Sequence, residues 1–243
     1  MQVKPYNYVS VIYSHLMRDI SFKEWTKYIC ELIDSNNLDN PKILELASGT
    51  GLVSEYLHPI FPEMVLSDIS LSMLKQIECQ NKNVVCCDMR DLPFKEKYNF
   101  IFSTFDSVNY LLRKKDIIKM FKEVEQILSD DGIFTFDVSL YKNSLRHSKV
   151  LNRKGTTKGM KYFQYSSFNK KNRIHTNKFK IILENGIIVT EIHKQKIYPF
   201  EFFFDAVSKT SLYVSNCYRA FTFKDANPDV DRAQFVIKKG KKC

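Results

Sequence analysis

The chain has 243 residues, of which 44% are hydrophobic and 14% aromatic, and its formal net charge is +10. These values suit one substantial buried core with room for a smaller appended part, and they exclude a coiled coil or a low-complexity disordered chain. No apolar run approaches the roughly 18 residues of a membrane span, so we expect no contact with a membrane interior.

The first residues have no apolar run after Lys4, so we expect no signal peptide and predict a cytoplasmic location. The six cysteines and five histidines show neither disulfide-framework nor metal-ligand spacing, and no metal site is predicted. The charge is divided unevenly along the chain. Residues 1–139 carry 15 basic and 20 acidic side chains, a net of −5, whereas residues 140–243 carry 22 and 7, a net of +15. Two physically different parts are therefore expected.

The first part alternates helical and strand patterns. Residues 8–34 carry apolar side chains at helical spacing, with Ser21 as a candidate N-cap within them. Further helices are predicted at 52–57, 71–79 and 115–128, turns at 48–51 and 130–132, and apolar strands at 42–47, 64–68, 84–88, 98–103 and 133–138. Strands that alternate with helices and are apolar along their whole length predict a parallel sheet with helices on both faces.

The pattern changes after Val138. Residues 155–198 alternate polar and apolar side chains around the hairpin signal Asn185-Gly186, as antiparallel strands do. A helix at 200–208 and two strands at 211–223 and 232–238 follow, and we expect these strands to rejoin the main sheet. The predicted fold is α/β: a doubly wound, Rossmann-like, mainly parallel seven-stranded sheet with a small antiparallel β cap inserted after the fifth strand. The predicted domains are a cofactor-binding part, 1–139 with 199–243, and a cap or substrate subdomain, 140–198.

Candidate functional residues follow the predicted parallel strands, where an open α/β sheet binds its ligand. Gly49 and Gly51 form a tight turn after the first strand, and such a turn lets a ligand approach the backbone. Asp68 ends the second strand and can accept hydrogen bonds from both hydroxyls of a ribose. Asp88-Met89 ends the third strand, with a carboxylate for an adenine amino group and an apolar side chain for its ring. Residues 105–110 follow the fourth strand and would face the reacting end of the ligand.

These segments together resemble the class I S-adenosylmethionine-dependent methyltransferases. Residues 45–51 resemble the family's first motif, with Ala47 in place of its first glycine. Asp68-Ile69-Ser70 with Met73 is similar to the ribose-binding segment, and Asp88-Met89 to the adenine-binding segment. A narrower resemblance, to amino-sugar N-methyltransferases with a β-rich cap, rests on residues 13–17 with Trp25, on residues 107–111, and on Glu191-Ile192-His193.

The resemblance implies a transfer of the methyl group of S-adenosylmethionine, with S-adenosylhomocysteine as product, to a nitrogen or oxygen of a small molecule. It implies that Tyr13, Tyr110 and His193 face the acceptor, although an ordinary strand histidine is an equal interpretation of His193. The cofactor site that it implies consists of Tyr13, Trp25, Glu45, Ala47, Ser48, Gly49, Asp68, Ile69, Met73, Asp88, Met89 and Phe105.

Two alternatives remain open from the sequence. The segment 142–180 has 12 Lys or Arg, no Asp or Glu, and interleaved aromatic residues, which favours an RNA methyltransferase. The signatures Asn/Asp-Pro-Pro-Tyr and Pro-Cys of base methylation are absent, however. The other alternative is a non-catalytic binding protein on the same fold. The sequence leaves the oligomeric state and the identity of the substrate open.

Overall fold

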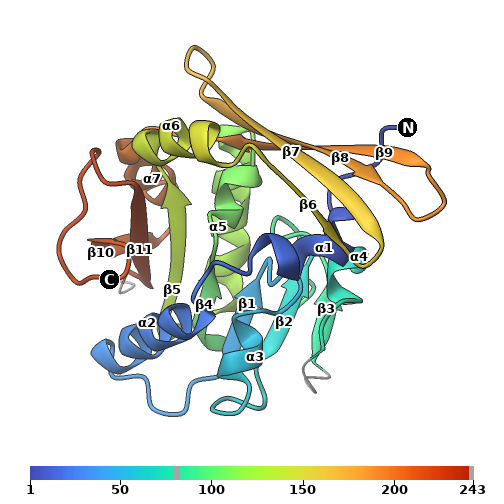
Figure 1. The fold of residues 1–243 in the computed structure, drawn as a ribbon. Coiled ribbons are helices and arrows are strands. Elements are labelled where there is room, and N and C mark those ends of the chain that lie inside the picture. Colours follow the sequence, from blue (N-terminus) through green and yellow to red (C-terminus); the bar gives the residue numbers. More distant parts are fainter. Residues whose placement is uncertain (79–82, 241–243) are drawn as a thin grey trace.

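The computed structural model describes residues 1–78 and 83–240 of the chain. Its larger sheet has seven strands in the order β10-β11-β5-β4-β1-β2-β3 (Figure 1). Strand β11 runs antiparallel to both of its neighbours and the other paired strands are parallel, as the sequence predicted. The strands are β1 (Ile43–Leu46), β2 (Val65–Asp68), β3 (Val84–Cys86), β4 (Tyr98–Ser103), β5 (Leu128–Ser139), β10 (Leu212–Arg219) and β11 (Arg232–Lys239).

Helices cover both faces of this sheet, and each face has its own apolar core. One face packs on α5 (Lys114–Ile127) and α7 (Phe200–Val207), and the other on α2 (Phe22–Ser35) and α3 (Ser54–Leu57). Helix α4 (Leu71–Leu74) follows β2, and the 3-10 helix η1 (Ser107–Tyr110) follows β4. Strand order reverses at β1, whose neighbours are β2 and β4, so the ligand-binding crevice of such a sheet lies beyond the ends of β1 and β4.

The cap is a separate four-stranded antiparallel sheet in the order β6-β7-β8-β9. Its strands are β6 (Arg153–Thr157), β7 (Met160–Asn169), β8 (Ile174–Ile182) and β9 (Ile188–Lys196). One face of this sheet packs on α1 (Val9–Leu16), which forms a third apolar core with it. The cap follows β5 in the chain, as expected. None of the described helices has the length and apolarity that crossing a membrane needs.

The structure refines several of the expected elements. The helix predicted at 71–79 ends at Leu74, and the strand predicted at 211–223 ends at Arg219. The helical pattern of 8–34 forms two helices, α1 and α2, and α1 packs on the cap whereas α2 packs on the large sheet. The side chain of Ser21 caps the second of them by accepting the backbone N–H of Glu24. Residues 130–132 are part of β5, where a register shift opposite β4 accommodates them. Helix α6 (Tyr141–Val150) was not predicted, since its sequence is polar. Residue 79, at the predicted end of α4, lies outside the described residues.

Candidate active site

A cavity of about 530 Å³ lies where the sequence placed the site, between the ends of β1 and β4, the helices α1 and α6, and the inner face of the cap. Eight of the predicted residues line it: Tyr13, Glu45, Ala47, Ser48, Gly49, Phe105, Tyr110 and His193. The cavity therefore brings together the first motif, the segment after β4 and two residues that the resemblance placed against the acceptor.

The loop after β1 turns back sharply toward the cavity. Ala47, Gly49 and Gly51 all have positive φ, at 56°, 60° and 74°. The positive φ at Gly49 favours glycine, and a side chain there would lie 3.1 Å from Met73 Cε, which would have to shift slightly. Ala47 keeps the left-handed turn that the family's glycine provides, at a conformational cost of about 1–2 kcal/mol. The hydroxyls of Ser48 and Thr50 in this loop are buried and make no hydrogen bond.

Two buried carboxylic acids stand behind the loop. Glu45 is 1% exposed, and its carboxylate accepts a hydrogen bond from the Ser54 hydroxyl. Burial raises the pKa of Glu45 to about 8, because it outweighs the hydrogen bond from the Ser54 hydroxyl, which lowers the pKa. Asp68 accepts the backbone N–H of Gly49 at 2.9 Å and that of Ser70 at 2.7 Å. Burial raises the pKa of Asp68 as well, and these two N–H groups oppose the rise.

The remaining predicted residues lie outside the cavity wall. Trp25 lines an adjoining cavity of about 780 Å³, which shares Phe105 with the first one. The side chain of Met73 is buried beside Gly49. The Asp88 carboxylate accepts hydrogen bonds from Nε and Nη2 of Arg90, and these bonds lower the pKa of its carboxyl group. Two further predicted residues also lie outside the cavity wall. Ile69 is 66% exposed, and Met89 packs against the apolar core beside α5.

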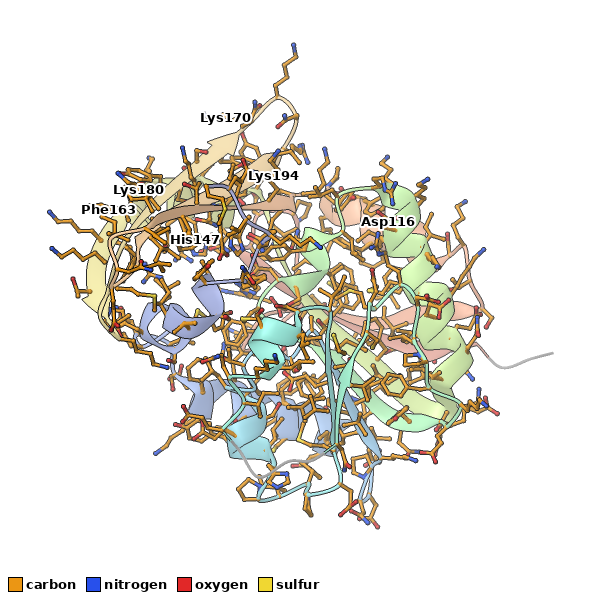
Figure 2. All side chains as sticks on the ribbon, turned by 90° about the vertical axis from the view of Figure 1, so that its right-hand side faces the viewer. Asp116, His147, Phe163, Lys170, Lys180 and Lys194 are labelled. Carbon is orange, nitrogen blue, oxygen red and sulfur yellow. The ribbon has the colours of Figure 1, made fainter. Side chains whose placement is uncertain are left out.

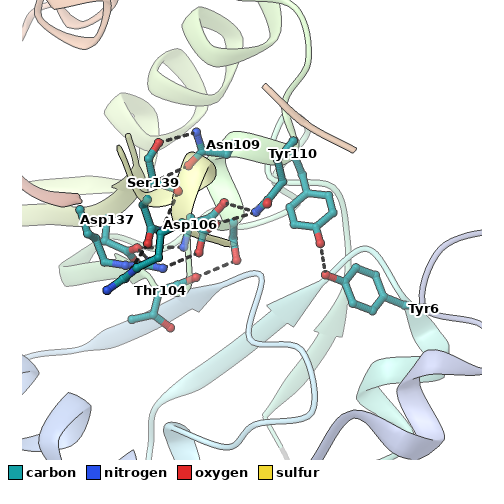
Figure 3. Close-up of polar contacts among 12 residues, drawn as sticks. Tyr6, Thr104, Asp106, Asn109, Tyr110, Asp137 and Ser139 are labelled. Atoms are coloured by element: carbon teal, nitrogen blue, oxygen red, sulfur yellow. Dashed lines mark hydrogen bonds and ion pairs between the residues drawn. The ribbon is translucent and has the colours of Figure 1, made fainter. Parts of the chain in front are cut away.

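A buried charge network fixes the loop after β4 (Figure 3). Arg232 of β11 forms ion pairs with Asp137 of β5 and, at 2.8 Å, with Asp106. The backbone N–H of Asp106 donates a hydrogen bond to the Asp137 carboxylate at 2.9 Å, and the Gln195 amide of the cap donates one to the Asp106 carboxylate at 2.8 Å. Burial by itself lowers the pKa of Arg232, but the two aspartates raise it above its usual value, so the guanidinium stays charged. The network ties the cap to the sheet at the cavity floor.

Aromatic side chains gather at the opposite wall. The hydroxyls of Tyr6 and Tyr110 are hydrogen-bonded at 2.6 Å, and the Tyr6 ring lies edge-on to Tyr13 and to His193. Burial raises the pKa values of these three tyrosines above the ordinary value, so they remain neutral phenols at physiological pH. His193 is 2% exposed and bonded to Glu191, which excludes the expectation of a partly exposed strand histidine.

The cap covers the cavity with uncharged polar groups and with one charged side chain, Arg153 of β6. Gln164 of β7, His175 and Asn177 of β8 and Gln195 of β9 point inward on alternate strand positions and line it. Nδ1 of His175 is buried without a hydrogen-bond partner. His147 of α6 lies below the cap in Figure 2, and burial lowers its pKa to about 4. Both histidines are therefore neutral at pH 7, since burial also lowers the pKa of His175.

Sequence reasoning missed several residues of this wall. Tyr6 precedes the first predicted helix and gave no pattern, and Arg232 is 126 positions from its partner Asp106. His147 and His175 are scattered histidines in the sequence, and only tertiary packing brings their rings to 6.4 Å. The strand alternation of the cap could have indicated His175, because it falls on the same face as the apolar Phe179 and Ile181.

Comparisons with known proteins agree with this geometry. Residues 43–132 match the family described as "Methyltransferase domain". The chain is 32% identical over 133 residues to the putative methyltransferase YqeM of Bacillus subtilis, an alignment that covers 52% of each protein. The chain thus spans about half the length of the curated relatives that it matches.

Solved structures match nearly the whole chain. An S-adenosylmethionine-dependent methyltransferase from Clostridium acetobutylicum superposes with a TM-score of 0.78 at 26% identity, covering 97% of this chain and 99% of that one. The sugar N-methyltransferase KedS8 from Streptoalloteichus shares the fold, with a TM-score of 0.72 at 14% identity over 92% of this chain and 90% of its own. Residues 43–132 thus match a methyltransferase domain, and nearly the whole chain shares the fold of an S-adenosylmethionine-dependent methyltransferase.

Proposed function

We propose that this chain transfers the methyl group of S-adenosylmethionine to a nitrogen or oxygen of a small molecule that lies beneath the cap. The observation that carries the proposal is the cap wall, where Asn177 and the unpartnered Nδ1 of His175 line the cavity as neutral hydrogen-bonding groups. Gln164 holds this wall in place, because it accepts from Arg153 at 2.7 Å and donates to Asn177 at 3.1 Å. Such groups recognise hydroxyl and amide functions of a small polar molecule. The shared fold with a sugar N-methyltransferase supports the same class of acceptor.

The donor set fits the methyl donor. The unbonded hydroxyls of Ser48 and Thr50, with the Glu45 carboxyl group, suit the amino and carboxylate groups of its methionine part. Asp68 keeps lone pairs free for ribose hydroxyls after accepting two backbone N–H groups. We assign Ile69 and Met73 to the ribose side with Asp68, and Asp88 and Met89 to the adenine. Closure of the site is assigned to Tyr13, Trp25 and Phe105.

The bound donor supplies a methyl group already activated by positive charge on sulfur. The protein has to align a nucleophile with it and exclude water. Tyr6, Tyr13 and Tyr110 stay protonated, so they orient the acceptor and surround the cationic centre with aromatic rings rather than remove a proton. An amine acceptor can lose its proton to solvent before attack, so no general base is required for nitrogen.

A titration with S-adenosylhomocysteine tests the cofactor half of this proposal. Wild-type protein should bind it, and Asp68→Ala should bind at least about tenfold more weakly, since a lost charge-assisted hydrogen bond corresponds to about 1.5–3 kcal/mol. Asp131→Ala, which removes an exposed carboxylate from β5, is the matched control and should bind like wild type. Absence of binding by wild type would contradict the proposal.

A methyl-transfer screen with labelled donor tests the acceptor half. Amino sugars and other hydroxylated amines should accept label, and Gln164→Leu with Asn177→Leu should raise KM for them while leaving cofactor affinity unchanged. Label in RNA alone would contradict the proposal. Of the basic side chains that raised the RNA alternative, Lys154, Lys161, Lys178 and Lys180 lie on the outer face of the cap. Arg153 lines the cavity, and three others lie on α6. A cytoplasmic location stays a prediction, and so does the division into domains at residues 139 and 199.

A further inference from the structure

The outer face of the cap sheet is basic along all four strands. Strand alternation and register place on this face Lys154, Lys161, Lys178, Lys180, Lys194 and Lys196. The single acidic residue of β6–β9, all of which the structure describes, is Glu191, and it points inward. Figure 2 shows Lys180 and Phe163 on the outer side of the cap, with His147 beneath it. This face is therefore separated from the cavity by the thickness of the sheet.

Two aromatic side chains lie among these lysines. Phe163 and Tyr165 are two positions apart on the interior strand β7, so their rings share the outer face about 7 Å apart. Tyr165 is 52% exposed. Phe163 pairs across the strands with Lys154 and Lys180, and Tyr165 pairs with Lys178. Each ring thus has a cation beside it, on a flat and open surface.

The lysines of this face have no compensating charge in the protein. Within the described residues, no ion pair links Lys154, Lys161, Lys178, Lys180 or Lys194 to an acidic side chain. No two of these lysines pair directly across neighbouring strands, but Lys161 lies diagonal to Lys180, and Lys178 to Lys194, so like charges are neighbours on this face. A bound polyanion would relieve this repulsion and release its own counterions.

We propose that the outer face of the cap binds single-stranded nucleic acid. Unpaired bases can stack on the rings of Phe163 and Tyr165 while the lysines beside them contact phosphates. An acidic protein would satisfy the lysines but leaves unexplained the exposed Tyr165 ring and the half-buried Phe163 ring beside it. The outer face of the cap points away from the cavity. This surface therefore binds the nucleic acid and does not present an acceptor atom to the methyl donor. The surface is thus a second binding site, independent of the transfer reaction.

Fluorescence anisotropy with a labelled single-stranded oligouridylate tests the proposal. A variant with Lys154, Lys178 and Lys180 all changed to Gln should bind the oligonucleotide at least about tenfold more weakly. The slope of log affinity against log salt should fall by about 2, since each lost phosphate contact accounts for roughly 0.7. The matched control changes Lys115, Lys119 and Lys122 of α5 to Gln. This control removes the same charge and should change neither affinity nor slope.

The aromatic pair gives an independent readout. Phe163→Ser with Tyr165→Ser should weaken binding at least about fivefold with an unchanged salt slope, because stacking contributes about 1–3 kcal/mol per base. Both outer-face variants should bind S-adenosylhomocysteine like wild type, which shows that they are folded and separates this test from that of the proposed function. The proposal is overturned if wild type fails to bind at low salt, if the two lysine triples lose affinity equally, or if removing the rings has no effect.

Discussion

Replacing Glu191 by Gln should detach the N-terminal segment that carries Tyr6 to the active site. Glu191 is fully buried on the inner face of β9, and its carboxylate accepts the backbone N–H groups of Tyr6 at 2.7 Å, Tyr8 at 2.5 Å and Val9 at 3.0 Å. Helix α1 has no side-chain cap from its own N-cap residue, so this carboxylate of the cap sheet performs that role. His193 is the fourth partner of Glu191.

The magnitude follows from these bonds. The glutamine side chain of Glu191→Gln keeps one acceptor oxygen, which can still accept the N–H groups of Tyr8 and Val9. Its NH2 group would face the N–H of Tyr6, so two donors would oppose each other. Hydrogen bonds to charged groups contribute about 1.5–3 kcal/mol, and a buried N–H left unpaired costs a similar amount. We therefore expect Glu191→Gln to destabilise the protein by about 2–3 kcal/mol, which lowers Tm by roughly 4 to 10 °C at this chain length.

Hydrogen exchange and thermal unfolding measure the effect directly. Amide exchange should accelerate in residues 1–17, and the affinity for S-adenosylhomocysteine should fall with it because Tyr13 lies on the released helix. Glu184→Gln, in the exposed turn between β8 and β9, is the control and should change none of these quantities. Unchanged exchange at Tyr6 and Val9 in Glu191→Gln, together with a Tm within about 1 °C of wild type, would refute the capping role.

Three further predictions concern the cavity floor. Glu45 has its pKa raised to about 8 from 4.5, so its contribution to stability is full below about pH 4.5 and is lost as pH rises toward 8. Urea unfolding should then show Glu45→Gln more stable than wild type by about 4–5 kcal/mol at pH 8.5 and equal to it near pH 4, and a constant difference would contradict the shift. Ala47→Gly should raise the free energy of unfolding by up to about 1 kcal/mol, because glycine adopts positive φ freely but loses more entropy on folding. Arg232→Met should cost about 3–5 kcal/mol by leaving Asp137 buried beside no cation, and adding Asp137→Asn should recover part of that loss in the same unfolding assay.

The sequence by itself determined the layered fold. Strands buried on both faces are apolar along their whole length, and the cap strands alternate, so the two sheets differ in period and composition. The ends of β1, β2 and β3 were marked by Gly49, Asp68 and Asp88, because a turn that meets a ligand needs particular residue types. Periodicity could not divide 8–34 into α1 and α2, since both helices are amphipathic and only their packing partners differ.

Only the tertiary structure decided which side chains meet at the cavity. Glu191 reaches the start of α1 across 182 positions, and Arg232 reaches Asp106 across 126, distances over which no local pattern carries information. The structure also separated the cap's two faces: the polar groups near His175 point to the cavity, and the lysines point away from it. The lysines of the cap strands lie on the outer face, because a strand sends successive side chains to opposite sides of its sheet.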